Sequence, residues 1–321
     1  MIRTSLPQPT RRSRYSRAKS VSESVSETIR TTKKRILFEF HEVEAWQRDN
    51  EFLRGKYRTV SGSYIESLKS IFYLHNQTGN IYSHLIGAVI SLVYAFYVGG
   101  TILNRYPTAD VYDLLAFGVF LGSAFICFGL SASFHIFGNH SNEVYHTWLM
   151  FDLYGIFVLI VGTVYSGTYY GFYCEPQYWR TYSVGIAVVV CACATLCSIP
   201  RFRAPQWRWA RASVFTAIGW LGALPMTHAA QSWGIEQAHK QMGWWYLILE
   251  GLSYGSGAAL YAVRFPERLR PGLFDIWGSS HQLFHVLTVC AAACHLIGLL
   301  KAFDYNHDPL TRRCLVPEAP F

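Results

Sequence analysis

The chain has 321 residues, of which 51% are hydrophobic and only 15% are charged, whereas a soluble domain carries about 25% charged residues. These values exclude a disordered protein, a coiled coil and an ordinary soluble enzyme. Residues 1–79 contain 15 Lys and Arg against 8 Asp and Glu, so they hold nearly all of the net charge of +8. A basic segment joined to a hydrophobic body favours an anionic membrane surface as its partner and argues against nucleic acid.

The N-terminal region is predicted to have two parts. Residues 1–60 are basic and poor in apolar side chains, so we expect a disordered cytosolic segment. Residues 61–77 contain apolar side chains with helical spacing, namely Tyr64, Ile65, Leu68, Ile71 and Phe72. This spacing predicts a short amphipathic helix that lies in the membrane interface just before the first span.

Seven apolar segments follow, each close to the roughly 20 residues that a helix needs to cross a bilayer. They cover residues 80–102, 113–135, 144–171, 181–199, 212–230, 243–263 and 281–301. Backbone polar groups must be paired inside lipid, so the segments predict helices. We therefore expect an all-α, multi-pass membrane protein of the plasma membrane or an endomembrane, with a bundle of seven transmembrane helices over residues 78–302.

The loops predict the orientation of this bundle. Loops on the side of the N-terminus contain seven Arg, whereas loops on the other side contain three Lys or Arg. Positive charge favours the cytosolic side. We therefore expect a cytosolic N-terminus and a C-terminal tail, residues 303–321, on the outer side. The eight cysteines form no CxxC pair and lie mostly in apolar segments, so we expect neither a disulfide framework nor a thiolate zinc site.

Three histidines at span ends predict a metal site. His281 and His285 open the seventh span at positions i and i+4, on one helical face. His135 closes the second span. Because successive spans alternate in direction, these ends lie at the same membrane face, whichever face that is. Three neutral imidazoles with one open position are the ligand set of a catalytic zinc site.

The other histidines are interpreted differently. His75, His84, His140 and His146 are read as satisfied polar or interfacial residues, and His41, His239 and His307 as exposed ones. His295 is about 15 Å further along the helix than His285. We expect it to be a packing or hydrogen-bonding residue that points away from the metal.

Two polar residues are predicted to accompany the three histidines. Asp152 lies about two turns into the third span, which starts at the same face, and Ser131 lies one turn deeper than His135. Buried carboxylates in a membrane are usually functional. The alternative interpretation is that Asp152 pairs with a buried Tyr or Arg and only fixes the packing. Glu250, a second internal carboxylate, receives no function from the sequence.

These residues resemble the adiponectin receptor (PAQR) family, which includes haemolysin-III-like proteins and fungal members tied to zinc and sterol homeostasis. The similarity covers about residues 78–301. The matching stretches are Thr78–Leu85, Ser131–His135, Asp152–Ile156, Arg264–Arg268 and Phe274–His285.

The resemblance implies a bundle of seven helices with a cytosolic N-terminus and one zinc held by His135, His281 and His285. It also implies that Asp152 stands beside the zinc-bound water and that Ser131 is the family's motif serine. Family members are regarded as lipid hydrolases acting on the ceramide amide and as receptors for extracellular ligands, and alkaline ceramidases carry a similar set of residues.

The leading hypothesis is therefore zinc-dependent hydrolysis of a ceramide-like membrane lipid, linked to lipid and metal homeostasis. The alternative is a seven-span receptor or signalling protein, responding to an extracellular ligand, in which the zinc is structural. A transporter or channel is disfavoured, because the sequence shows neither a row of intramembrane charges nor broken helices.

Overall fold

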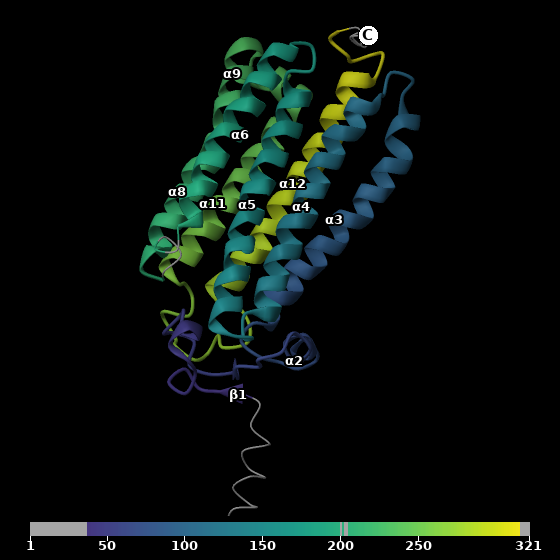
Figure 1. Cartoon of the computed structure of the whole chain (residues 1–321). Coiled ribbons are helices and arrows are strands. Elements are labelled where there is room, and N and C mark those ends of the chain that lie inside the picture. Colours follow the sequence, from purple (N-terminus) through teal and green to yellow (C-terminus); the bar gives the residue numbers. More distant parts are fainter. Residues whose placement is uncertain (1–36, 200, 202–204, 315–321) are drawn as a thin grey trace, which may run out of the picture.

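The computed structural model describes residues 37–199, 201 and 205–314. Long helices run side by side in a bundle, the N-terminal elements lie at one end of it, and helix α12 (Ser280–His307) ends at the other (Figure 1). Residues 1–36, for which disorder is predicted, fall outside the described residues.

The long helices cover all of the predicted spans. They are α3 (Thr78–Arg105), α4 (Val111–Phe137), α5 (Asn142–Gly171), α6 (Pro176–Ser198), α8 (Arg208–Trp220), α9 (Ala223–Trp233), α11 (Trp244–Val263) and α12 (Ser280–His307), with η3 (Pro205–Trp207) before α8 and α10 (Ile235–Met242) before α11. Within the described residues, α3, α4, α5, α6 and α12 are long and apolar enough to cross a membrane. Seven crossings and their direction remain predictions.

The fifth predicted span, residues 212–230, is interrupted rather than continuous. Helix α8 ends at Trp220 and α9 begins at Ala223. Pro225, in the first turn of α9, has no N–H to offer the carbonyl of Leu221, and its ring would clash with that carbonyl in a continuous helix. The expectation that no helix is broken is therefore wrong at this point.

Residues 37–60 are folded, contrary to the prediction of disorder for residues 1–60. Strand β1 (Leu37–Phe38) pairs antiparallel with β2 (Tyr57–Arg58), and a 3-10 turn, η1 (Ala45–Gln47), lies between them. Val43, Leu53 and Tyr57 form a small buried cluster. These few apolar residues leave no periodic signal in the sequence.

Contacts with the loop before α12 hold this N-terminal segment in place. Asn50 donates a hydrogen bond to Glu267, and the backbone N–H of Arg54 donates to Asp275. The backbone N–H of Gly272 also donates to the carbonyl of Phe52. The partners are more than 200 residues apart in the chain, so local sequence patterns do not reveal the pairing.

A short helix follows where the amphipathic segment is predicted. Helix α2 (Tyr64–Lys69) continues into η2 (Ser70–Phe72). Ile65 is 66% exposed and Phe72 is 86% exposed. Apolar side chains are thus left uncovered by protein on the face that the sequence assigns to the membrane interface.

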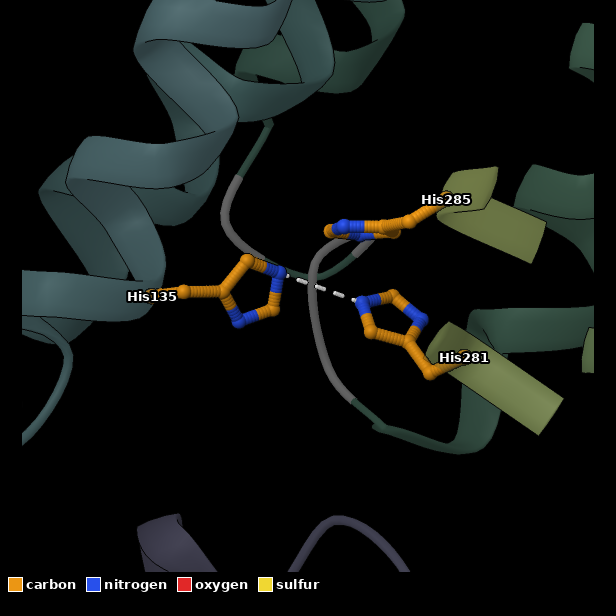
Figure 2. Close-up of side chains that lie close together, drawn as sticks. All are labelled: His135, His281 and His285. Atoms are coloured by element: carbon orange, nitrogen blue, oxygen red, sulfur yellow. Dashed lines mark hydrogen bonds between the residues drawn. The ribbon is translucent and has the colours of Figure 1, made fainter. Parts of the chain in front are cut away.

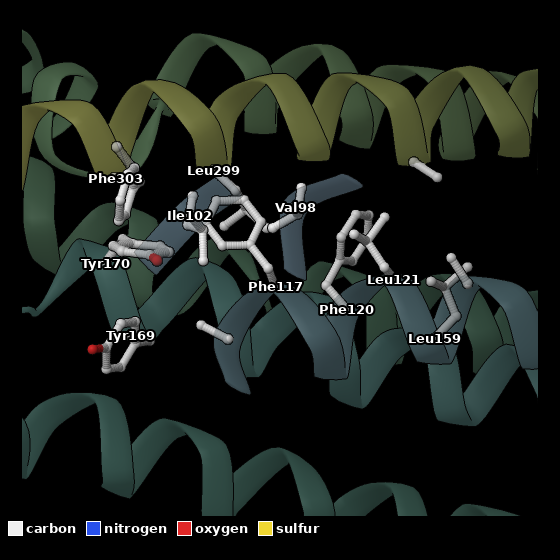
Figure 3. Close-up of a cluster of buried hydrophobic side chains, with 14 of the residues drawn as sticks. Val98, Ile102, Phe117, Phe120, Leu121, Leu159, Tyr169, Tyr170, Leu299 and Phe303 are labelled. Carbon is white, nitrogen blue, oxygen red and sulfur yellow. The ribbon is translucent and has the colours of Figure 1, made fainter. Parts of the chain in front are cut away.

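The hydrophobic core lies between α3, α4, α5 and α12 (Figure 3). Phe117 of α4 contacts Tyr170 of α5 and Phe303 of α12, and all three are almost fully buried. Helix α12 continues to His307, so residues 303–307 belong to the bundle and not to the predicted outer tail. His307 itself is fully buried and bonds Asp113 through Nε2 at 3.0 Å, which corrects its interpretation as an exposed residue.

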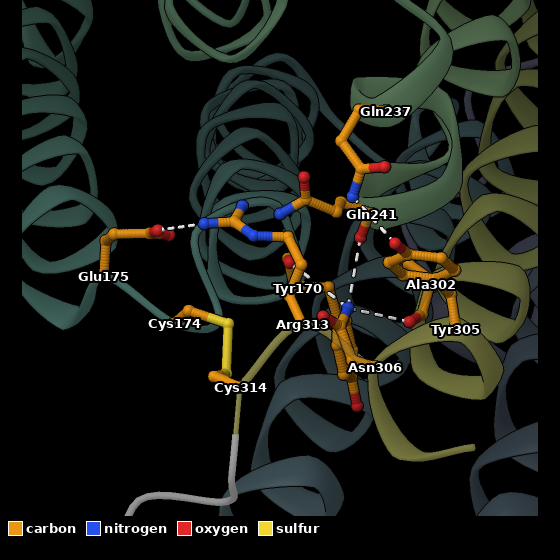
Figure 4. Close-up of a disulfide and its surroundings, with 10 residues drawn as sticks. All are labelled: Tyr170, Cys174, Glu175, Gln237, Gln241, Ala302, Tyr305, Asn306, Arg313 and Cys314. Atoms are coloured by element: carbon orange, nitrogen blue, oxygen red, sulfur yellow. Dashed lines mark hydrogen bonds and ion pairs between the residues drawn. A yellow bond between two sulfur atoms is a disulfide. The ribbon is translucent and has the colours of Figure 1, made fainter. Parts of the chain in front are cut away.

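A disulfide lies at the end of the bundle where α5 and α12 end (Figure 4). Cys174, which follows α5, is bonded to Cys314, which follows α12. An ion pair between Glu175 and Arg313 lies beside it. The expectation of no disulfide is therefore wrong, because the two cysteines are 140 residues apart and meet only after the bundle has formed.

Candidate metal centre

The structure brings His135, His281 and His285 together at the end of the bundle that carries the N-terminal segment (Figure 2). One ring nitrogen from each lies within 4.8 Å of the other two. The Nε2 atoms of His135 and His281 are 3.2 Å apart. His135 comes from the last turn of α4, and the other two lie on one face of the first turns of α12.

This geometry fits a metal ion. Zinc–nitrogen bonds of about 2.0–2.1 Å in a tetrahedral site place two ligand nitrogens roughly 3.4 Å apart. The distance between the two Nε2 atoms is close to that value. A shared metal ion therefore accounts for it without a hydrogen bond between the rings. Imidazole ligands suit zinc and other divalent transition metals.

Residues around the start of α3 orient two of these rings. The Nδ1 atom of His135 lies 2.8 Å from Oε1 of Gln77. The Nδ1 atom of His285 lies 3.2 Å from the carbonyl oxygen of Asn80 and 3.3 Å from the hydroxyl of Ser83. A ring that donates its Nδ1–H to such an acceptor keeps Nε2 deprotonated and available for a metal.

His84 is a fourth histidine of the site, and the sequence interpretation missed its place. Its ring stacks on His285 with 3.6 Å between centroids and 8° between planes. The residue is buried, and within the part of the chain that the structure describes neither ring nitrogen has a hydrogen-bond partner. It is therefore not the satisfied polar residue that we expected; it restricts the orientation of His285.

Arg58 supports the end of α4 that carries His135. Its buried guanidinium donates to the backbone carbonyls of His135 and Ile136 at 2.6 and 2.8 Å. These carbonyls lie in the last helical turn, where no further N–H is available to them. Burial lowers the pKa of Arg58 to about 10, so the side chain is still protonated at neutral pH.

Replacing Gln77 with leucine is expected to weaken metal binding by about 10- to 100-fold, since loss of an outer hydrogen-bond partner has effects of this size. Competition with a chelator of known affinity measures the change. Gln77→Glu is the control, because it keeps an oxygen acceptor for the Nδ1–H of His135. Equal affinities in the wild type and Gln77→Leu would show that this contact does not orient the ligand.

Asp152 and Ser131 line the same cavity as the three histidines. Ser131 is buried one turn before His135, and its hydroxyl hydrogen-bonds to the carboxylate of Asp152. Within the described residues, the two come from neighbouring helices, α4 and α5, that are packed along their length. The hydroxyl of Ser131 is thus one polar neighbour of this carboxylate.

The cavity has a volume of about 1090 Å³ and extends from the N-terminal segment into the middle of the bundle. Apolar residues such as Leu149, Leu159 and Leu247 form much of its wall. His295 lies further along this wall and is paired with Glu250, away from the three histidines. A space of this size is suited to a long apolar ligand.

Comparison with known proteins agrees with this architecture. The profile of the haemolysin-III-related family matches residues 72–296. The chain is 36% identical to the yeast (Saccharomyces cerevisiae) protein named ADIPOR-like receptor IZH2 over 85% of this chain and 86% of that one. It is 36% identical to the Adiponectin receptor protein of Drosophila melanogaster over 86% of this chain, and this match spans 61% of the fly protein.

A plant relative extends the comparison. Heptahelical transmembrane protein 4 of Arabidopsis thaliana is 31% identical over 81% of this chain and 86% of its own length. The family match covers more than two thirds of the chain and includes all three histidines. The chain is therefore an integral, multi-pass membrane protein and belongs to the haemolysin-III-related family, which includes the adiponectin-receptor-like proteins.

Proposed function

We propose that this protein is a zinc-dependent hydrolase acting on the amide bond of a ceramide-like membrane lipid. The observation that carries the proposal is a three-histidine group that opens into a large apolar cavity beside a carboxylate. A closed structural site would have no such access for a ligand. Zinc at this position would polarise the carbonyl of the substrate amide and lower the pKa of a bound water to about 7.

Asp152 is the proposed general base. Its carboxylate would take a proton from the attacking water and return it to the leaving amine. Ser131 can donate its single hydroxyl proton either to this carboxylate, which holds the carboxylate in place, or to the oxygen on which negative charge develops. Apolar wall residues would hold the acyl chain and exclude bulk water from the reacting amide.

The hydrolase proposal is tested with purified protein and ceramide. We expect release of free fatty acid that stops when a chelator removes the metal and returns when zinc is added. A lipid hydroxamate, which binds an accessible metal, should inhibit the reaction. No release by protein with a full metal content would contradict the proposal.

The second candidate is a receptor in which zinc is structural. Support for it comes from the way the ligands and their hydrogen-bond partners join α3, α4 and α12, which a bound metal would tie together. Two of the relatives are also named as receptors. A full metal content with no binding of the hydroxamate would favour this candidate.

We also propose that the metal centre faces the cytosol. Disulfides form in oxidising compartments, and Cys174–Cys314 lies at the opposite end of the bundle from the three histidines. The basic N-terminal segment and the exposed apolar face of α2 would then meet the anionic inner leaflet. Antibody access to an N-terminal tag only after permeabilisation would support this orientation, and access in intact cells would contradict it.

A further inference from the structure

A second polar cluster lies deep in the bundle. Oε2 of Glu250 on α11 is 2.8 Å from Nδ1 of His295 on α12, and Nε2 of His295 is 2.9 Å from the hydroxyl of Ser166 on α5. The three residues are 5%, 1% and 0% exposed. Ionisable side chains within membrane segments are costly and usually functional.

The order Ser–His–Glu has the distances of a nucleophilic triad, but Ser166 is not placed to act as a nucleophile. Its hydroxyl also lies 2.8 Å from the carbonyl oxygen of Gly162, within its own helix. It is fully buried and does not line the cavity, whereas Glu250 and His295 do. Ser166 and His295 are therefore positioning residues that fix the carboxylate of Glu250.

Part of the hydrogen-bonding capacity of this cluster is unused. His295 contacts only Oε2 of Glu250. Among the described residues, none donates a hydrogen bond to the other carboxylate oxygen, Oε1. The hydroxyl of Tyr254, one helical turn along α11, is buried and has no hydrogen-bond partner among these residues. The same holds for the hydroxyl of Thr163, one turn before Ser166 on α5. Glu250, Tyr254 and Thr163 all line the cavity of the metal centre.

The cluster lies at a defined depth relative to the three histidines. Gly257 of α11 is packed against Phe284 of α12, and Gly243 against Gly298, so the two helices run in opposite directions. His295 is ten residues beyond His285, which corresponds to about 15 Å along α12. Tyr254 lies between the two levels.

We propose that Glu250, Tyr254 and Thr163 form a subsite that hydrogen-bonds a hydroxyl group in the middle of the ligand's acyl chain. This inference rests on the proposed function, which puts the amide at the three histidines. A hydroxyl can donate to Oε1 of Glu250 and accept from the hydroxyl of Tyr254 or Thr163. An unsubstituted chain leaves all three groups unpaired, which is unfavourable in an apolar cavity.

The test compares ricinoleoyl ceramide with oleoyl ceramide, which have the same chain length and double bond and differ only in the mid-chain hydroxyl. Full-length protein in nanodiscs, with a fluorescent ceramide bound, is titrated with each of the two lipids. The dissociation constant of each lipid is read from displacement of the fluorescent ceramide. We expect the wild type to bind the ricinoleoyl lipid about three- to tenfold more tightly, as one or two hydrogen bonds allow.

The double variant Thr163→Val/Tyr254→Phe should bring this ratio close to one. Because neither hydroxyl has a hydrogen-bond partner within residues 37–199, 201 and 205–314, the variant should keep the thermal stability of the wild type. Ser256→Ala is the matched control, since this hydroxyl is exposed and bonds only within its own helix. It should leave the preference unchanged.

Equal dissociation constants in the wild type, or an unchanged preference in the double variant, would overturn the subsite. A preference seen only with free ricinoleic over oleic acid would overturn its assignment to the amide ligand. The readout is binding, so a protein that binds with this preference but hydrolyses nothing would contradict the proposed function and leave the subsite standing.

Discussion

Protein carrying His285→Ala is expected to lose its metal, falling from about one zinc per chain to a small fraction of that value. His285 supplies one of three ligand nitrogens, and the remaining two cannot hold the ion against a chelator. Metal analysis by mass spectrometry of detergent-purified protein measures the content directly. The thermal unfolding midpoint should fall as well, because metal binding to the native state contributes to its stability.

His239→Ala is the matched control for this experiment. His239 is a half-buried histidine of α10, not the exposed one that the sequence predicts, and this helix is packed against α12 near the other end of the bundle. The control should keep both its metal and its unfolding midpoint. Wild-type protein that is folded and contains no zinc would remove the metal centre from consideration, and the three histidines would then be interfacial residues.

The variant Asp152→Asn is expected to keep its metal and to hydrolyse ceramide about 10²- to 10⁴-fold more slowly, which is the usual contribution of a general base. The amide is the same size as the carboxylate and can still bond to Ser131, so the fold should be preserved. It cannot take the proton from water. Rates are measured with saturating zinc, so that a change in metal affinity does not contribute.

Ser131→Ala provides the comparison, because it removes the partner of the carboxylate and leaves the base in place. We expect a smaller loss of rate, about tenfold, the order of one hydrogen bond. Equal rates in Asp152→Asn and the wild type would exclude Asp152 as the base and would leave the receptor with a structural zinc as the better account.

The helical architecture and the grouping of the three histidines could be predicted because both follow from the length and the number of the apolar segments. Apolar length identifies the spans, and the parity of the spans puts His135 at the same face as His281 and His285. Seven crossings stay a prediction, but the parity argument needs only that the second and seventh spans run in opposite directions. The roles of Asp152 and Ser131 likewise remain predictions.

The remaining features depend on contacts between distant parts of the chain, which counting cannot supply. Gln77 and His84 bear on the site only because α3 is packed against α4 and α12. Glu250 appeared to lack a function because its partner, His295, lies on another helix. Arg58 gave no signal because its partners are two backbone carbonyls and the hydroxyl of Ser70, none of which is a charged side chain.

The contacts of the N-terminal segment have a consequence for synthesis of the protein. Residues 37–60 leave the ribosome long before their partners Glu267 and Asp275, which come just before the last helix. His135 must likewise wait for His281 and His285. The segment and the metal centre can therefore assemble only after nearly the whole chain has been inserted. A product truncated before residue 267 would lack these partners of the N-terminal segment and both co-ligands of His135, so protease sensitivity of residues 37–60 would report incomplete translation.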